Sequence, residues 1–184
     1  MSLGSQARLV QADKWLQARI QNGRVQVYQT CGDEKGSRVV KRLPEVLLVD
    51  DNPADVVLVR EALTGSRHQS HVSNVADGEQ AMAFLHRAGP YINAPRPDLM
   101  MLDLNLPKKD GRAVLAEVKA DAKLRAIPVV IFSTSRSILE IARSYELGAN
   151  CYVSKPGNLQ EYFLAVKSIE EFWFGSASLP REEK

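Results

Sequence analysis

The chain has 184 residues, 45% of them hydrophobic and 25% charged, and a net charge of +2. This length and composition fit one globular domain with a short extension and exclude collagen-like or wholly disordered chains. The apolar runs at 46–49 and 99–102 are far shorter than the roughly 20 residues of a membrane helix. With no signal peptide and only two cysteines, Cys31 and Cys151, we expect a cytoplasmic protein without disulfides.

The first 43 residues form a basic extension. They carry 8 Lys or Arg against 3 Asp or Glu, whereas residues 44–184 carry 16 against 19. The basic residues are scattered, and no known nucleic-acid-binding motif accompanies them. We therefore expect no nucleic acid partner. A weak helical spacing at 11–20 predicts one helix, and 31–38 is typical of a loop. We expect residues 1–43 to be an extension of unknown role that could be partly disordered.

From Glu45 onward, five short apolar runs alternate with five stretches of helical periodicity. Several runs are continuously apolar, which is typical of parallel strands buried on both faces. The predicted strands are 46–49, 72–76, 99–102, 129–132 and 151–153, and the predicted helices are 53–63, 78–85, 112–119, 138–147 and 159–174. This pattern predicts an α/β domain at 44–174 with a doubly wound (βα)5 parallel sheet, followed by a tail at 175–184.

Local signals support several of these boundaries. Asn52 is a suitable cap for the first helix, with Pro53 at its first position, and Gly148 follows the fourth helix. Apolar faces are expected on the fourth helix, through Ile138, Ile141 and Tyr145, and on the last helix, from Leu159 to Trp173. Cys151 is expected to be buried. The aromatic residues 172–174 cannot all face the core, which leaves a partly covered edge or a homodimer face as alternatives.

Polar side chains follow the predicted strands where those strands end. Asp50 and Asp51 follow the first strand, Asp103 the third, Ser133 ends the fourth, and Lys155 follows the fifth. The carboxyl ends of parallel strands meet at one edge of such a sheet. Converging carboxylates repel one another, so we expect Lys155 and a hard divalent ion such as Mg²⁺ to neutralise them.

Each of these residues also has an ordinary structural explanation. Acids before a helix can act only as caps, and most lysines are solvated. Asp103 is harder to explain in this way, since a carboxylate at the end of a buried strand should be paired or functional. Taken together, the positions favour a phosphoryl-transfer site in which Asp103 is the nucleophile and forms an acyl phosphate.

The sequence resembles a known family, the receiver domain of two-component response regulators. The resemblance covers about residues 43–173 and rests on four motifs, Leu48-Val49-Asp50-Asp51, Leu102-Asp103-Leu104-Asn105-Leu106-Pro107 with Gly111, Ser133-Thr134 and Lys155-Pro156. It implies a flavodoxin-like sheet with strand order 2-1-3-4-5. The stretches 94–98, 103–111 and 169–173 further resemble small regulators that are paired with bacterial phytochrome kinases.

The resemblance implies a role for each site residue. Asp103 would be the phosphoacceptor, and Lys155 would contact the phosphoryl group. Asp50, Asp51, Asp103 and the backbone carbonyl of Asn105 would hold Mg²⁺.

A conformational switch is also implied. Ser133 matches the switch hydroxyl, and Tyr152 matches the aromatic residue that turns inward when this hydroxyl moves. The corresponding Lys-Pro bond is commonly cis in the family, which makes a cis Lys155–Pro156 bond plausible.

The implied function is that of a stand-alone phosphoacceptor rather than an enzyme, although it would take part in phosphoryl transfer and in its own dephosphorylation. The phosphoryl donor would be a sensor histidine kinase, for which a bacterial phytochrome is the candidate, and the signal would pass to an unidentified protein. Two alternatives stay open, a receiver-like binding module that takes no phosphate and a Mg²⁺-dependent phosphatase. The phosphatase is disfavoured because Asn105 stands where such enzymes place a second, proton-donating Asp.

Overall fold

The computed structural model describes residues 15–21, 24–32 and 38–180. The chain forms two compact units, Met1–Leu43 and Pro44–Lys184. In the first unit, an antiparallel sheet has the order β1-β2-β3, with β1 at Trp15–Gln21, β2 at Arg24–Gly32 and β3 at Arg38–Arg42.

The helix predicted at 11–20 is therefore wrong for its described part. Residues 15–20 lie in β1, and 11–14 lie outside the described residues. β1 pairs with β2 from Trp15 opposite Thr30 to Gln21 opposite Arg24. This pairing with a later segment overrides a weak local period. The expected loop at 31–38 is also shorter, because Cys31 and Gly32 end β2 and Arg38 begins β3, while 33–37 lie outside the described residues.

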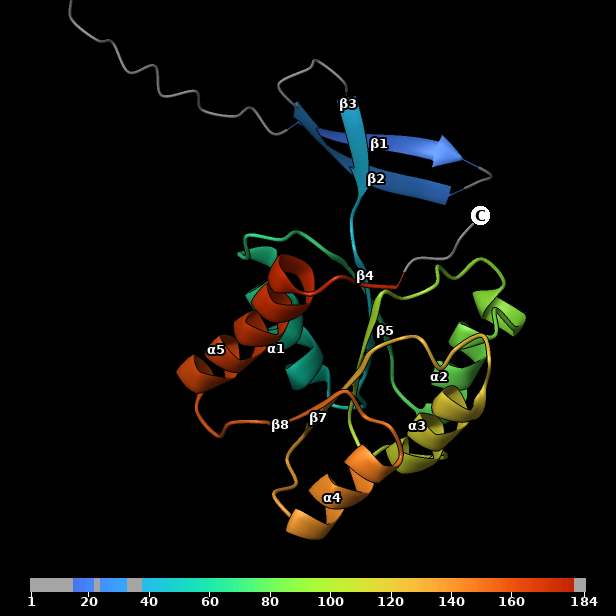
Figure 1. The fold of residues 1–184 in the computed structure, drawn as a ribbon, viewed down its shortest axis with the longest axis vertical. Coiled ribbons are helices and arrows are strands. Elements are labelled where there is room, and N and C mark those ends of the chain that lie inside the picture. The colour runs from blue at the N-terminus through green and yellow to red at the C-terminus, as the bar shows by residue number, and fades with distance from the viewer. Residues whose placement is uncertain (1–14, 22–23, 33–37, 181–184) are drawn as a thin grey trace, which may run out of the picture. The chain divides into compact units, whose positions relative to one another are not determined.

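The second unit is built on a parallel five-stranded sheet with the order β5-β4-β6-β7-β8 (Figure 1). Counted within this unit, the order is 2-1-3-4-5, which confirms the predicted topology. The strands are β4 (Glu45–Val49), β5 (His71–Val75), β6 (Leu99–Leu102), β7 (Val129–Ser133) and β8 (Cys151–Ser154).

Helices cover both faces of this sheet, with α1 and α5 on one face and α2 and α3 on the other, while α4 lies beside β8 (Figure 1). The helices are α1 (Pro53–Thr64), α2 (Gly78–Leu85), α3 (Gly111–Ala120), α4 (Ile138–Glu146) and α5 (Leu159–Glu170), with a short 3₁₀ turn η1 (Gly89–Tyr91) and a π-helical segment η2 (Glu171–Ser176).

The continuously apolar strands divide their side chains between two cores. Leu47 and Val49 of β4 pack with α2 and α3, whereas Val46 and Leu48 pack with α1 and α5. All four side chains are buried. Two-sided burial explains why the runs 46–49, 99–102 and 129–132 are continuously apolar. The strand β5, at one edge of the sheet, instead contains Ser73 and Asn74.

The helix boundaries show which local signals were reliable. Asn52 accepts a 3.0 Å hydrogen bond from the Ala54 backbone N–H, with Pro53 at the first helical position, as predicted. Gly148 has a φ of +94°, which suits a glycine after a helix end.

Three expectations about apolar positions are corrected. On α4, Ile138 is 82% exposed and Tyr145 is 49% exposed, so much of the expected apolar face is not covered in this unit. On α5, Leu159 is exposed. The helix predicted to reach 174 continues past Glu170 as the π-helical segment η2, which ends at Ser176. Cys151 is only half-buried. A helical period identifies an apolar face but does not supply the element that would cover it.

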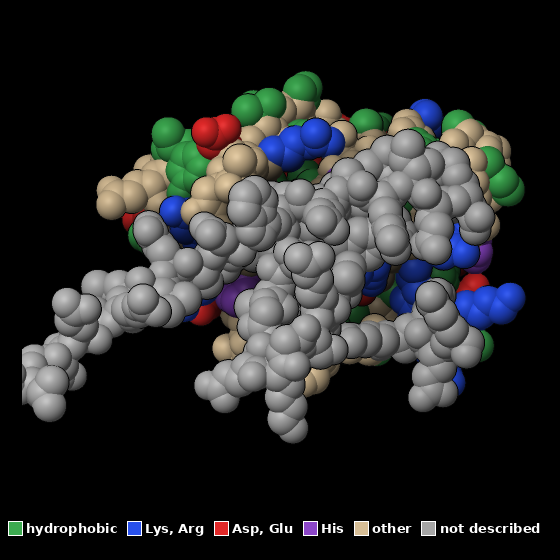
Figure 2. Space-filling view, turned by 90° about the horizontal axis from the view of Figure 1, so that it is seen from above, with side chains coloured by type: hydrophobic (Ala, Val, Ile, Leu, Met, Phe, Trp, Pro, Cys, Tyr) green, Lys and Arg blue, Asp and Glu red, His purple; other side chains and the backbone are tan. Residues whose placement is uncertain are grey.

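Figure 2 shows one face of the molecule with its side chains coloured by type. Where described side chains are visible, basic, acidic and apolar types lie side by side. Within the described part of the chain, no helix is long and apolar enough to span a membrane.

Candidate functional site

Four of the polar residues predicted from the sequence converge at the carboxyl edge of the sheet. Asp50 follows β4, Asp103 follows β6, Ser133 ends β7, and Lys155 follows β8. All four are buried, with exposures of 0–7%. Buried charges are stable only when they are paired and hydrogen-bonded, so their partners define the site.

Lys155 is the centre of this cluster. Its Nζ donates to Asp103 Oδ2 at 2.6 Å, to Asp50 Oδ2 at 2.7 Å and to Asp55 Oδ2 at 2.9 Å. An ammonium group has three N–H donors, so every donor meets a carboxylate. Three carboxylates against one ammonium leave the cluster with excess negative charge.

The Asp103 carboxylate is held at both oxygens. Its Oδ1 accepts from Ser133 Oγ at 2.7 Å and from the Asn105 backbone N–H at 3.1 Å, while Oδ2 accepts from Lys155. Asp103 therefore has a fixed orientation, with a hydroxyl on one side and an ammonium on the other. This arrangement suits a carboxylate that must present an oxygen to an electrophile.

The local electrostatics follow from burial and pairing. Burial would lower the pKa of Lys155, but its hydrogen bonds to Asp103 and Asp50 and their charges raise the pKa above its ordinary value. Burial raises the pKa of Asp50, and the opposing bond from Lys155 only partly compensates. Lys155 thus stays charged, while Asp50 is the carboxylate that protonates more readily than usual.

Of the remaining predicted residues, Asp51 and Tyr152 form no hydrogen bond to this cluster among the described residues, whereas Asn105 joins it through its backbone N–H. The Asp51 side chain is exposed and meets no hydrogen-bond partner among the described residues. Tyr152 donates from its hydroxyl to the Ser135 carbonyl at 2.9 Å. The Asn105 side chain is exposed, and its backbone N–H is the group that contacts Asp103. The Lys155–Pro156 bond is trans, so the cis expectation is wrong.

Asp55 is a member of the cluster that the sequence reasoning missed. It stands in the first turn of α1, where an acid is also favoured by the helix dipole. Its Oδ2 accepts from Asn52 Nδ2 at 3.0 Å as well as from Lys155. The spacing from Asn52 to Asp55 resembles a capping box, and this was the available signal for its position near the helix start.

Two tight contacts hold the loop that carries Asp103. A Cβ on Gly111 would lie 2.2 Å from the Asp103 carbonyl oxygen, so only glycine allows this approach. On the other side of the loop, Lys108 adopts a φ of +62° and its Nζ contacts the buried Asp77 carboxylate at 2.6 Å. Asp77 in turn caps α2 through the Gln80 backbone N–H. The loop is therefore fixed to α2 and α3.

The donor set fits a hard divalent cation. Asp50 and Asp103 supply carboxylate oxygens, and the cluster has excess negative charge. Within the described residues, no three Asp, Glu, His or Cys side chains form a ready-made metal cage. An ion held by few carboxylates, with water completing its shell, is typical of Mg²⁺.

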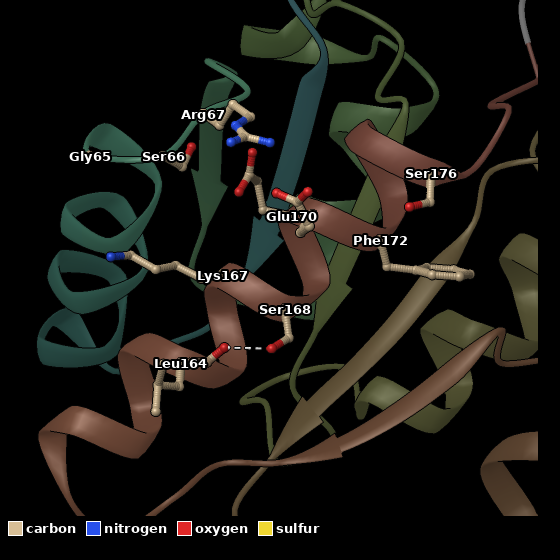
Figure 3. A pocket seen from close by; sticks show the side chains of 10 residues that line it. Gly65, Ser66, Arg67, Leu164, Lys167, Ser168, Glu170, Phe172 and Ser176 are labelled. Carbon is tan, nitrogen blue, oxygen red and sulfur yellow. Dashed lines mark hydrogen bonds between the residues drawn. The ribbon is translucent and has the colours of Figure 1, made fainter.

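A surface cleft of about 570 Å³ lies elsewhere, between the α1–β5 loop and the end of α5 (Figure 3). Its lining includes Arg67, Lys167 and the exposed Phe172. Glu170 is buried there and accepts a 2.8 Å hydrogen bond from the His68 backbone N–H. This bond ties the end of α5 to the loop after α1, which is a structural role.

Known proteins resemble this chain over the unit that contains the cluster. The family model for the response regulator receiver domain matches residues 46–167. "Response regulator Rcp1" of Synechocystis sp. (strain ATCC 27184 / PCC 6803 / Kazusa) is 49% identical over 135 residues, covering 73% of this chain and 92% of Rcp1.

Solved structures agree with this similarity. The phosphorylated cyanobacterial phytochrome response regulator RcpA is 52% identical, with a TM-score of 0.73 over 76% of this chain and 99% of RcpA. The Mn²⁺-bound form of Rcp1 is 48% identical, with a TM-score of 0.73 over 75% of this chain and 99% of that one. The chain belongs to the response regulators with a receiver domain and is a phosphoacceptor signalling protein of the Rcp1 type.

Proposed function

We propose that Asp103 receives the phosphoryl group in this response regulator and that a sensor histidine kinase donates it. The observation that carries this proposal is the buried Asp103 carboxylate, held between the Ser133 hydroxyl and the Lys155 ammonium. Both neighbours are donors that can turn from the carboxylate to the oxygens of an incoming phosphoryl group.

In the proposed transfer, an oxygen of Asp103 attacks phosphorus in line. The bond between phosphorus and the imidazole nitrogen of the donor breaks, and its electron pair leaves with the imidazole. Asp103 then carries an acyl phosphate. Lys155 and Ser133 supply positive charge and a hydrogen bond where negative charge gathers on the phosphoryl oxygens, and such positioning and neutralisation are the main needs of phosphoryl transfer.

We further propose that Asp50, Asp51, Asp103 and the Asn105 carbonyl hold a divalent cation, with Mg²⁺ as the natural ion. When bound, this ion would supply charge neutralisation for the phosphoryl group. The excess carboxylate charge around Lys155 supports the proposal. Asp51, exposed beside Asp50, is available as a ligand without breaking a hydrogen bond to another described residue.

The relay would begin at Ser133. A phosphoryl group adds about −1.5 to −2 charges and new acceptor oxygens, which would draw the Ser133 hydroxyl from Asp103 Oδ1 to the phosphoryl group. Tyr152, whose hydroxyl bonds the Ser135 carbonyl in the next loop, could then turn inward and alter the surface around α4 and β8. A separate protein would recognise that surface.

A bacterial phytochrome is our candidate for the kinase, acting in the cytoplasm. The support is similarity, because RcpA, 52% identical to this chain, is described as a cyanobacterial phytochrome response regulator. Phosphotransfer from phytochrome kinases, compared with unrelated histidine kinases at equal concentration, tests this assignment. Faster transfer from an unrelated kinase would overturn it.

The acceptor assignment is tested by intact-mass spectrometry with acetyl phosphate. Wild type should gain one phosphoryl group in the presence of Mg²⁺, and Asp103→Asn, which keeps the shape of the side chain, should gain none. Equal phosphorylation of both proteins would refute Asp103 as acceptor. No gain in a folded wild type that binds Mg²⁺ would favour a phosphate-independent binding module.

A further inference from the structure

Asp55 is the carboxylate of the cluster that neither the acceptor role nor the metal role uses. We infer that Asp55 is a positioning residue for phosphoryl transfer, which holds the Lys155 ammonium at the site while Asp103 and Asp50 change partners. This inference rests on the proposed function of Asp103, which it extends to a residue in α1.

Lys155 is held by three carboxylates. Its three N–H donors are shared among Asp103, Asp50 and Asp55. When Lys155 turns from Asp103 to the oxygens of the incoming phosphoryl group, as proposed above, its bond to Oδ2 is lost. If Asp50 shares its charge with a divalent ion, its bond to Lys155 weakens as well. The hydrogen bond from Lys155 to Asp55 is then the contact that remains.

Asp55 is itself fixed by hydrogen bonds. Its Oδ2 accepts from Asn52 Nδ2 at 3.0 Å, and the Asn52 side-chain oxygen caps α1 through Ala54. The Asn52 backbone N–H donates to Asp50 Oδ1 at 3.0 Å. These bonds close a ring that runs from Asp50 through Asn52 and Asp55 to Lys155 and back to Asp50.

The Asp55 side chain lies in largely buried surroundings. Its side chain is 15% exposed, and it lies beside the buried hydroxyl of Tyr162 from α5. This hydroxyl makes no hydrogen bond of good geometry with any described residue. Burial and the negative charge of Asp55 raise the pKa of Tyr162, so the tyrosine stays neutral and adds no second negative charge beside Asp55.

The test is a double-mutant cycle on the initial rate of phosphorylation by acetyl phosphate at saturating Mg²⁺. Asp55→Ala should slow the reaction about 10-fold to 100-fold, which is the usual loss when a supporting partner of an active group is removed. In a Lys155→Ala background, Asp55→Ala should change the rate less than twofold, because its effect passes through Lys155. Glu61→Gln, an exposed acid on the same helix, is the matched control and should react at the wild-type rate.

A second readout does not depend on activity. In metal-free protein labelled with ¹⁵N-lysine, the Lys155 ammonium should give an NMR signal, because three hydrogen bonds and burial protect its protons from exchange. Asp55→Ala should broaden or remove this signal, and Asp55→Glu should restore part of it. Chemical denaturation of each variant reports any general loss of folding.

The outcomes separate this inference from the proposed function. An unchanged rate and an unchanged ammonium signal in Asp55→Ala would overturn the positioning role, even if Asp103→Asn is inert. An equally large effect of Asp55→Ala with and without Lys155 would also overturn it, because Asp55 would then act directly on the metal or the donor. Normal phosphorylation of Asp103→Asn would instead refute the acceptor assignment.

Discussion

Replacing Lys155 with methionine should destabilise the metal-free protein strongly. The substitution keeps an unbranched apolar chain but removes the ammonium that contacts three carboxylates at 2.6–2.9 Å. Opposite unit charges about 3 Å apart attract by about 5–6 kcal/mol at an effective dielectric near 20, before the cost of burying them is subtracted. Removing one partner of such a buried pair typically costs about 3–5 kcal/mol, and we expect a loss in that range at pH 8.

The loss should be smaller in mild acid. Burial already raises the pKa of Asp50 above 3.8, and Lys155 is the main group that opposes this shift. Without Lys155 the pKa of Asp50 should rise further, so the native variant binds a proton that the unfolded chain does not. Its stability therefore falls as the pH rises through the folded pKa. The stability lost on replacing Lys155 with methionine should therefore be smaller at pH 5.5 than at pH 8.

Urea unfolding followed by far-UV circular dichroism, in the presence of EDTA, measures the free energy of unfolding of wild type and Lys155→Met at both pH values. Lys167→Met, at an exposed lysine of α5, is the matched control and should change stability by less than about 0.5 kcal/mol. Adding Mg²⁺ should restore more stability to Lys155→Met than to wild type, because the ion replaces the missing cation. A loss below about 1 kcal/mol at pH 8, or an equal loss at both pH values, would refute this reasoning.

Two further predictions concern the loop that holds the acceptor. Burial would raise the pKa of Asp77, but the hydrogen bonds that it accepts from Lys108 and Gln80 lower the pKa below 3.8. The Asp77 carboxylate therefore stabilises the fold above pH 3.8, and this stabilisation is lost as the pH falls through the folded pKa. Asp77→Asn, which can still cap α2, should be less stable than wild type at pH 7 in urea unfolding, and the gap should close below pH 3.8; a constant gap would contradict this. Gly111→Ala should cost about 1–3 kcal/mol in thermal unfolding because its Cβ meets backbone at 2.2 Å, whereas Gly157→Ala, in open space, should cost much less; equal losses would contradict the contact.

Local sequence features were sufficient to predict the sheet. The fully apolar stretch Leu99–Leu102 is buried along its whole length, and the Asn52–Pro53 pair begins α1 as expected. These features depend on backbone conformation and two-sided burial, which neighbouring residues largely determine. The alternation of strands and helices predicts a parallel sheet whose carboxyl ends share one edge, so the convergence of Asp50, Asp103 and Lys155 could also be predicted. The strand order itself was implied by the family resemblance.

The features that failed depend on contacts between distant segments. Asp55 has the appearance of an ordinary first-turn acid, and its bond to Lys155 spans 100 residues of sequence. The segment 15–20 has a weak helical period, but it becomes a strand because β2 pairs with it. Ile138 stands at the helical spacing that is typical of a buried apolar face, yet nothing in its own unit buries its side chain.

The most direct test of the central claim is to locate the phosphoryl group. Wild type is treated with acetyl phosphate and Mg²⁺, reduced with borohydride, which converts an acyl phosphate of aspartate into homoserine, and analysed by peptide mass mapping. We predict homoserine at position 103 and unmodified aspartate at 50, 51 and 55. Homoserine at any of those three positions, with Asp103 intact, would contradict the account.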